Sequence, residues 1–233
     1  MIWATGMVLA PSRNLPAAKF GGMDQKRIIH QYLDKLHQYL DKHRTALLAK
    51  LDGADERAVR WPMTRTGTNL LGLVKHVAGI ELGYFGDVFD RPSHIRLPWL
   101  DEGAETNADM WATAEESREE IVALYLRAAV HADATIEALA LDSPGRVPWW
   151  SPPERQQVTL QQIMVHVTAE IARHAGHADI VRELIDGAAG DNNGELPDQT
   201  ANQWATYRLQ LQEAAVEAAR RTEMGDPGQP RTS

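Results

Sequence analysis

The sequence predicts an all-α fold: a four-helix bundle with long inter-helix loops and an extra C-terminal helix. Three observations support this prediction. Apolar residues recur at helical spacing in five segments. Two of these segments are preceded by a threonine that is followed three residues later by Glu or Gln, a pattern typical of helix starts. Strand signals are nearly absent, because no segment alternates apolar and polar residues over a sustained run.

The helices are predicted from apolar periodicity and from residues that start or end helices. Capping boxes are expected at Thr113 with Glu116 and at Thr159 with Gln162. Residues 1–22 contain prolines and glycines without periodicity. The predicted helices have the approximate bounds 24–51, 68–88, 113–140, 159–186 and 200–221. The predicted organisation is an unstructured leader (1–22), a helical bundle domain (23–221) and a flexible tail (222–233).

Composition limits the classes of function. The 233 residues, 43% of them hydrophobic and 24% charged, are enough for a globular domain with a sizeable core. A net charge of -8 argues against binding to nucleic acid or to anionic lipid. With no cysteine, the chain has no disulfide, thiolate ligand or thiol nucleophile of its own. No apolar run approaches the roughly 18 residues of a membrane span. We expect a cytoplasmic protein.

Four potential metal ligands form a row in the fourth predicted helix: His166, Glu170, His174 and His177. At about 100° per residue, their side chains fall within about 80° of one another around the helix. Such groups are costly to bury beside a core unless they are hydrogen-bonded or bind a metal. The row indicates a polar site, although a single histidine of this kind is more often a hydrogen-bonded core or surface residue.

Glu170 and His174 lie about 6 Å apart along the helix, so both can reach one ion at roughly 2.0–2.2 Å. His76, in the middle of the second predicted helix, is the best third ligand. Three protein ligands leave a position for water or substrate, the pattern of a catalytic site, and zinc or nickel suits them. His177, about 10 Å along the helix from Glu170, is expected beside the ion as a proton carrier.

Two long loops carry tryptophans, and we expect both to overhang the metal. The loops cover residues 90–112, with Trp99, and residues 141–158, with Trp150. Long ordered loops are more often functional than accidental, and aromatic walls suit small ligands. Trp99 and Trp150 are therefore the expected pocket wall, while a role as core anchors stays open for Trp150 and its neighbour. The acidic residues Glu115, Glu116, Glu119 and Glu120 are interpreted as a solvated helix start.

The segments from Gly67 to Gly86 and from Glu170 to Ile180 resemble the DinB-like superfamily of metal-binding four-helix bundles. More narrowly they resemble its mini-circle-protein branch, which is related to mycothiol-dependent maleylpyruvate isomerase. The segment from Arg146 to Trp150 is similar to a loop common in that branch. The resemblance covers roughly residues 40–190.

The resemblance implies a metal held by one residue of the second helix and two of the fourth, which map to His76, Glu170 and His174. Many members have histidine at all three positions, and Glu170 in the middle is similar to the isomerase-type arrangement. His177 stands where many members have glutamine. His166, one turn before the ligand pair, looks like a residue that supports the ligands.

Characterised relatives include transferases and isomerases that use mycothiol, bacillithiol or glutathione. We therefore expect a metal-dependent enzyme that depends on a low-molecular-weight thiol. Its expected cofactors are a divalent metal ion and mycothiol or another small thiol. Its expected partners are a small-molecule substrate or thiol and a second copy in a homodimer, but neither nucleic acid nor a membrane. A non-catalytic metal-binding stress or interaction protein and a metal-dependent hydrolase stay open as alternatives.

Overall fold

The computed structural model describes residues 25–101, 103–190, 197 and 199–224. The chain divides into two compact units between residues 191 and 192. The first unit holds the bundle, and the second holds one long helix, α6 (Ala201–Met224). The predicted leader and most of the predicted tail lie outside the described residues, while residues 222–224 continue α6. The extent of the predicted bundle domain stays a prediction.

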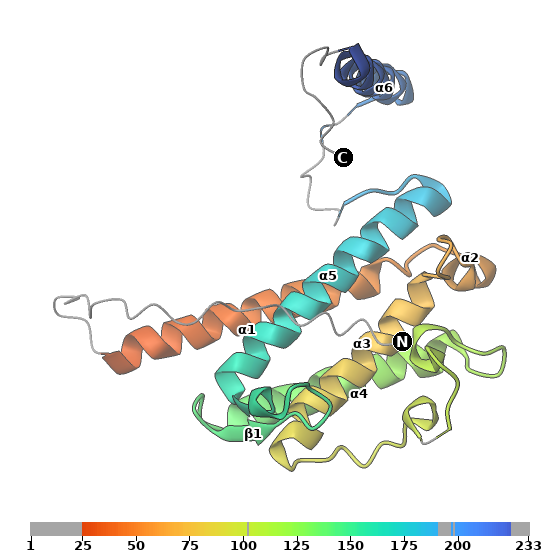
Figure 1. Ribbon diagram of the computed structural model, residues 1–233. Helices are drawn as coiled ribbons and strands as arrows, with labels where there is room; N and C mark the ends of the chain where they lie inside the picture. Colours follow the sequence, from red (N-terminus) through yellow and green to blue (C-terminus); the bar gives the residue numbers. More distant parts are fainter. Residues whose placement is uncertain (1–24, 102, 191–196, 198, 225–233) are drawn as a thin grey trace, which may run out of the picture. The chain divides into compact units, whose positions relative to one another are not determined.

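The first unit is built from four long helices, as predicted from the sequence (Figure 1). They are α1 (Gln25–Ala49), α3 (Leu70–Phe85), α4 (Arg118–Ala138) and α5 (Leu160–Asp186). A short helix that the sequence did not predict, α2 (Glu56–Arg60), lies between α1 and α3. With α6 as the extra C-terminal helix, the predicted all-α fold class is confirmed.

The core forms where α3 packs against α4 and α5, and where α1 packs against α5 (Figure 1). Apolar side chains at helical spacing supply it, because burying one stripe of each helix removes a large apolar area from water. α3 is buried on most of its circumference and is the central helix of the bundle. Representative side chains with no more than 1% exposure are Leu40, Leu47, Val74, Val77, Phe85, Tyr125, Ile163, Val167 and Ile171.

The two predicted capping boxes have different outcomes in the structure. Thr159 caps α5 through the predicted capping box with Gln162, and Gly187 ends it in the left-handed conformation at φ 80°. The start predicted for α4, at Thr113, is wrong. α4 begins at Arg118, and its capping box joins Ser117 and Glu120.

The two long loops have short regular pieces of their own. The loop between α3 and α4 contains three 3-10 helices, Asp87–Phe89, Pro98–Leu100 and Ala108–Met110. The loop between α4 and α5 contains a 3-10 helix, Pro153–Arg155, and two antiparallel strands. These strands are β1 (Pro144–Arg146) and β2 (Gln157–Thr159), with Gly145 opposite Val158. Three-residue strands are too short to show an alternating pattern, so they were not predicted from the sequence.

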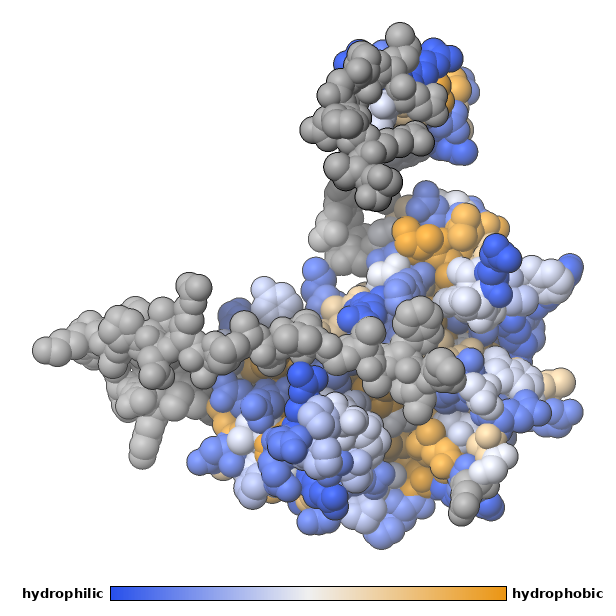
Figure 2. Space-filling view, in the orientation of Figure 1, coloured by the Kyte–Doolittle hydropathy of each residue, from blue (hydrophilic) through white to orange (hydrophobic). Residues whose placement is uncertain are grey.

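The face of the first unit shown in Figure 2 is mostly hydrophilic, with hydrophobic residues gathered in a few patches. Ile180 and Leu184, four residues apart on α5, are each 59% exposed. Among the helices that the structure describes, none combines the length and the apolar character needed to cross a bilayer.

Candidate functional site

The four polar residues of the predicted row all lie on α5, an uninterrupted helix of 27 residues. Their exposure differs along the row. His174 is buried, with 8% of its surface exposed, whereas His166 and Glu170 are half-buried and His177 is exposed. The row therefore crosses from the core, where His174 stands against α3, to the surface of the bundle.

His76 on α3 meets His174 on α5. Their ring centroids are 4.7 Å apart, and the rings are nearly perpendicular at 77°. Eight residues further along α3, Tyr84 contacts His166, which lies eight residues back along α5, with centroids 4.8 Å apart. The two helices are thus antiparallel here, and the two ring contacts lie about 12 Å apart along the axis. Glu170 lies one helical turn from His166 and from His174, between these two levels.

The imidazole of His174 lacks hydrogen bonds although it is buried. Its Nδ1 has no partner among the described residues. Its Nε2 lies 3.9 Å from Oε2 of Glu170, which is beyond hydrogen-bond distance. The pKa of His174 falls to about 3, mainly because burial disfavours the charged form and secondly because His76 and His177 lie nearby. His174 is therefore a neutral imidazole with one N–H and one nitrogen lone pair, and neither is hydrogen-bonded within the part of the chain that the structure describes.

His76 is held from the other side by a loop residue that the sequence did not single out. Nδ1 of His76 lies 2.6 Å from Oδ2 of Asp109, within the 3-10 helix Ala108–Met110. The hydrogen bond from His76 lowers the pKa of Asp109, so its carboxylate is ionised. A carboxylate that accepts from Nδ1–H leaves Nε2 of His76 as the free ligand atom.

An aromatic group lies next to Glu170. Tyr84, Trp149, Trp150 and His166 come from α3, from the loop between α4 and α5, and from α5. The indole Nε1 atoms of Trp150 and Trp149 donate to the hydroxyl oxygen of Tyr84 at 2.9 and 3.3 Å. Trp150 also contacts His166 with ring centroids 5.0 Å apart. Because the oxygen of Tyr84 accepts two hydrogen bonds, its own hydrogen is left to donate.

Trp99, the second tryptophan of the predicted wall, lies in the 3-10 helix Pro98–Leu100 and contacts Lys75, the residue before His76 on α3. The Nζ of Lys75 lies 4.1 Å from the ring centroid of Trp99, a cation–π contact. The same Nζ donates to the backbone oxygen of Trp111 and to Glu116, both at 2.9 Å. The interpretation of Glu116 as part of a solvated helix start is therefore wrong, because its carboxylate pairs with a buried lysine; Glu115, Glu119 and Glu120 are exposed.

Both long loops thus lie against α3 near the predicted ligands. One places Asp109 on His76 and Trp99 beside Lys75, and the other places Trp150 on Tyr84. The rings of His174 and His177 are 5.7 Å apart, and His177 has its surface exposed. The roles predicted for Trp99, Trp150 and His177 stay predictions. Asp109 and Tyr84 had no sequence signal, since each acquires its partner only through tertiary packing.

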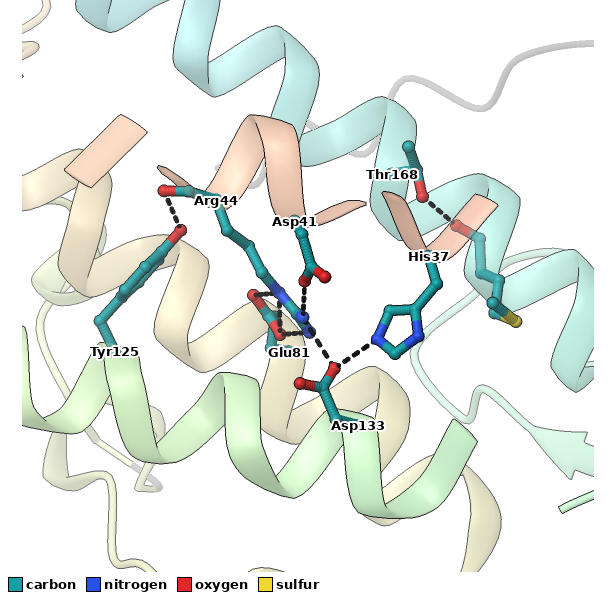
Figure 3. Close-up of polar contacts among 8 residues, drawn as sticks. His37, Asp41, Arg44, Glu81, Tyr125, Asp133 and Thr168 are labelled. Atoms are coloured by element: carbon teal, nitrogen blue, oxygen red, sulfur yellow. Dashed lines mark hydrogen bonds and ion pairs between the residues drawn. The ribbon is translucent and has the colours of Figure 1, made fainter. Parts of the chain in front are cut away.

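A second group with metal-ligand chemistry lies between α1 and α4. Ligand atoms of His37, Asp41 and Asp133 lie within 4.8 Å of one another. A cation is already present there: Nη1 of Arg44 donates to Asp41 at 2.9 Å and to Asp133 at 2.7 Å (Figure 3). Nε of Arg44 also donates to both oxygens of the buried Glu81, at 3.0 and 3.1 Å. The guanidinium thus takes the position that a metal ion would need.

The family model described as mycothiol-S-transferase matches residues 35–187. Comparisons with curated proteins and with solved structures give no match. The matched segment covers more than half of the chain and includes α3, α4, α5 and every residue of the site around His76 and His174. It confirms the resemblance drawn from the sequence. The chain belongs to the mycothiol-S-transferase family.

Proposed function

We propose that this protein is a cytoplasmic, metal-dependent transferase that uses mycothiol or a closely related small thiol. His76, Glu170 and His174 are the proposed ligands of a divalent ion, with zinc or nickel as the candidates. The observation that carries this proposal is the buried His174. It comes from a different helix than His76, stands against the ring of His76, and has a nitrogen without a partner among the described residues.

The donor atoms fit such an ion. Two ligands that bind zinc at about 2.0–2.1 Å with a tetrahedral angle lie about 3.4 Å apart. Nε2 of His174 and Oε2 of Glu170 are 3.9 Å apart, too far for a hydrogen bond and close enough to share one ion. Two neutral imidazoles and one carboxylate form the ligand set of many catalytic zinc sites. Such a set leaves room for an exogenous ligand.

A divalent ion in this position would lower the pKa of a bound thiol and so supply a thiolate at neutral pH. The chain has no cysteine, so the sulfur must come from a small molecule. In the proposed transfer, the sulfur forms a bond to an electrophilic carbon of the second substrate as the leaving group departs. The thiol proton passes to a base, and the exposed His177 beside His174 is the proposed acceptor. The hydroxyl of Tyr84, next to Glu170, can donate to an acceptor on the substrate.

The test uses purified protein, mycothiol and a haloalkyl or haloaryl electrophile, with metal content measured alongside product formation. Wild type should contain close to one transition-metal ion per chain and form the thioether. His174→Ala should lose the metal and the activity. His177→Ala should keep the metal and lose rate.

Two results would overturn the proposal. Full activity in metal-depleted protein would show that the reaction does not depend on a metal. Metal-containing protein whose activity does not depend on a thiol would favour a hydrolase or a non-catalytic metal protein. A homodimer stays a prediction, which size-exclusion chromatography with light scattering checks.

A further inference from the structure

The loop between α3 and α4 reaches the proposed metal ligands through a single carboxylate. Oδ2 of Asp109 accepts a hydrogen bond from Nδ1 of His76 at 2.6 Å. Both groups are partly shielded, with side-chain exposures of 23% for His76 and 28% for Asp109. A charge-assisted hydrogen bond of this length fixes both the tautomer and the orientation of the ring.

The backbone that directly follows Asp109 is fastened to residues of α3 and its N-cap. The side-chain amide of Asn69, the residue that caps α3, donates to the backbone oxygen of Met110 at 3.2 Å. Lys75 donates to the next backbone oxygen, that of Trp111, at 2.9 Å. Residue 107 enters the 3-10 helix in the left-handed conformation at φ 63°. Asp109 is therefore held by main-chain contacts and not by its own side chain alone.

Gly72 makes this close approach possible. A Cβ added to Gly72 would lie 1.8 Å from the backbone oxygen of Met110, so any side chain there forces the loop away from α3. Gly79 offers the contrast. It lies three residues after His76, as Gly72 lies four before it, and its added Cβ would be 3.8 Å from Nε1 of Trp99, an ordinary contact. The absence of a side chain is therefore required for docking of the Asp109 segment at Gly72 but not at Gly79.

We infer that Asp109 is a positioning residue for the metal: it orients Nε2 of His76 toward the ion and makes metal affinity depend on how the loop between α3 and α4 docks on α3. This inference rests on the proposed function, because it takes His76 as a metal ligand. Carboxylates that hold the second nitrogen of a metal-bound imidazole typically change metal affinity by 10- to 100-fold.

The test measures the apparent Kd of zinc by competition with a chromophoric chelator, in the full chain and without any substrate. Asp109→Ala should weaken zinc binding by about 10- to 100-fold. Asp109→Asn should lose less, because its amide oxygen still accepts from Nδ1–H but carries no charge. Asp101 is an exposed aspartate of the same loop whose side chain pairs with the exposed Arg96, and Asp101→Asn is the matched control that should bind zinc as wild type does.

A glycine pair tests the docking step without touching any ligand. Gly72→Ala should weaken zinc binding as Asp109→Ala does, and combining the two should add little further, since both act through the same hydrogen bond. Gly79→Ala should leave the Kd unchanged. Chemical unfolding of the metal-free proteins separates positioning from plain destabilisation: Asp109→Asn should unfold near the wild-type midpoint while still binding zinc more weakly.

Equal zinc affinity in wild type, Asp109→Ala and Asp109→Asn would overturn this inference and leave the proposed function standing. Loss of affinity that only parallels loss of metal-free stability would also overturn it. An absence of saturable zinc binding in the wild type would instead overturn the proposed function, and the inference with it.

Discussion

Two polar clusters lie on roughly opposite sides of α3, and they differ in how their charges are matched. Glu81 follows His76 by five residues, which places their side chains about 140° apart around the helix. On the Glu81 side, Arg44 bonds Glu81, Asp41 and Asp133, and His37 bonds Asp133 at 3.0 Å (Figure 3). On the His76 side, His174 has a buried nitrogen with no partner among the described residues.

This difference separates a cluster that holds the bundle together from one that is open to a ligand. Buried polar groups in native proteins are almost always hydrogen-bonded, so an unpaired one calls for an explanation. In the Arg44 cluster the guanidinium is hydrogen-bonded to carboxylates, and the hydroxyl of Tyr125 also donates to the backbone oxygen of Arg44 at 3.0 Å. Burial raises the pKa of Glu81, and the guanidinium of Arg44 opposes that shift. In the His76–His174 cluster, by contrast, the buried Nδ1 of His174 has no hydrogen-bond partner in the part of the chain that the structure describes.

The largest effect is expected from breaking the Arg44 cluster. Glu81→Ala should lower the free energy of unfolding by about 3–5 kcal/mol, because it leaves the buried charge of Arg44 without its main partner. Glu81 has no exposed side-chain surface and Arg44 has 6%. Urea unfolding in the presence of a chelator measures the effect. The double variant Arg44→Met/Glu81→Leu should cost far less, and a double variant as unstable as Glu81→Ala would contradict this account.

A smaller effect on stability is expected from removing the proposed metal ion from the His76–His174 cluster. An ion that binds only the folded protein stabilises it by about 2.7 kcal/mol at a hundredfold excess over its Kd. A chelator should therefore lower the Tm of wild type, followed by differential scanning fluorimetry, and zinc should restore it. His76→Ala should not respond to either treatment, whereas Glu81→Gln, altered only in the other cluster, should still respond. A chelator response in His76→Ala equal to that of wild type would rule out His76 as a ligand.

The smallest effect concerns protons in the open cluster of the metal-free protein. The pKa of His174 falls from 6.5 to about 3, mainly through burial. In the unfolded chain His174 therefore binds a proton near pH 6.5, whereas in the folded chain it binds one only near pH 3. The free energy of unfolding therefore falls as the pH falls from 6.5 toward 3. At pH 5.5 the expected loss from this group is about 1 kcal/mol. His174→Gln should lack this component in unfolding curves at pH 7.5 and pH 5.5. Parallel losses in both proteins would assign the effect to other groups.

The local part of the site could be predicted from the sequence because a helix repeats every 3.6 residues. That period alone places His166, Glu170 and His174 on one side of α5, and the capping pattern at Thr159 sets where the helix begins. The same reasoning was wrong at Thr113, where the pattern of a capping box recurs four residues later at Ser117. The later box leads directly into the apolar run of α4. Glu116 does accept from the backbone N–H of Thr113, but it also pairs with Lys75, and no helix begins there.

The sequence by itself determined the four-helix class, the row of potential metal ligands on α5 and the absence of any thiol in the chain. These depend on local periodicity and composition, which need no knowledge of what lies nearby. Only the tertiary structure decided that His76 stands against His174, that Asp109 holds His76, and that Arg44 completes the other cluster. Apart from the local pair of Arg44 and Asp41, these contacts join residues that are more than 30 positions apart, and their approach follows from how the helices and loops pack together. Histidines and carboxylates therefore belong to a hydrogen-bonded ion network on one side of α3 and form the proposed ligand set on the other.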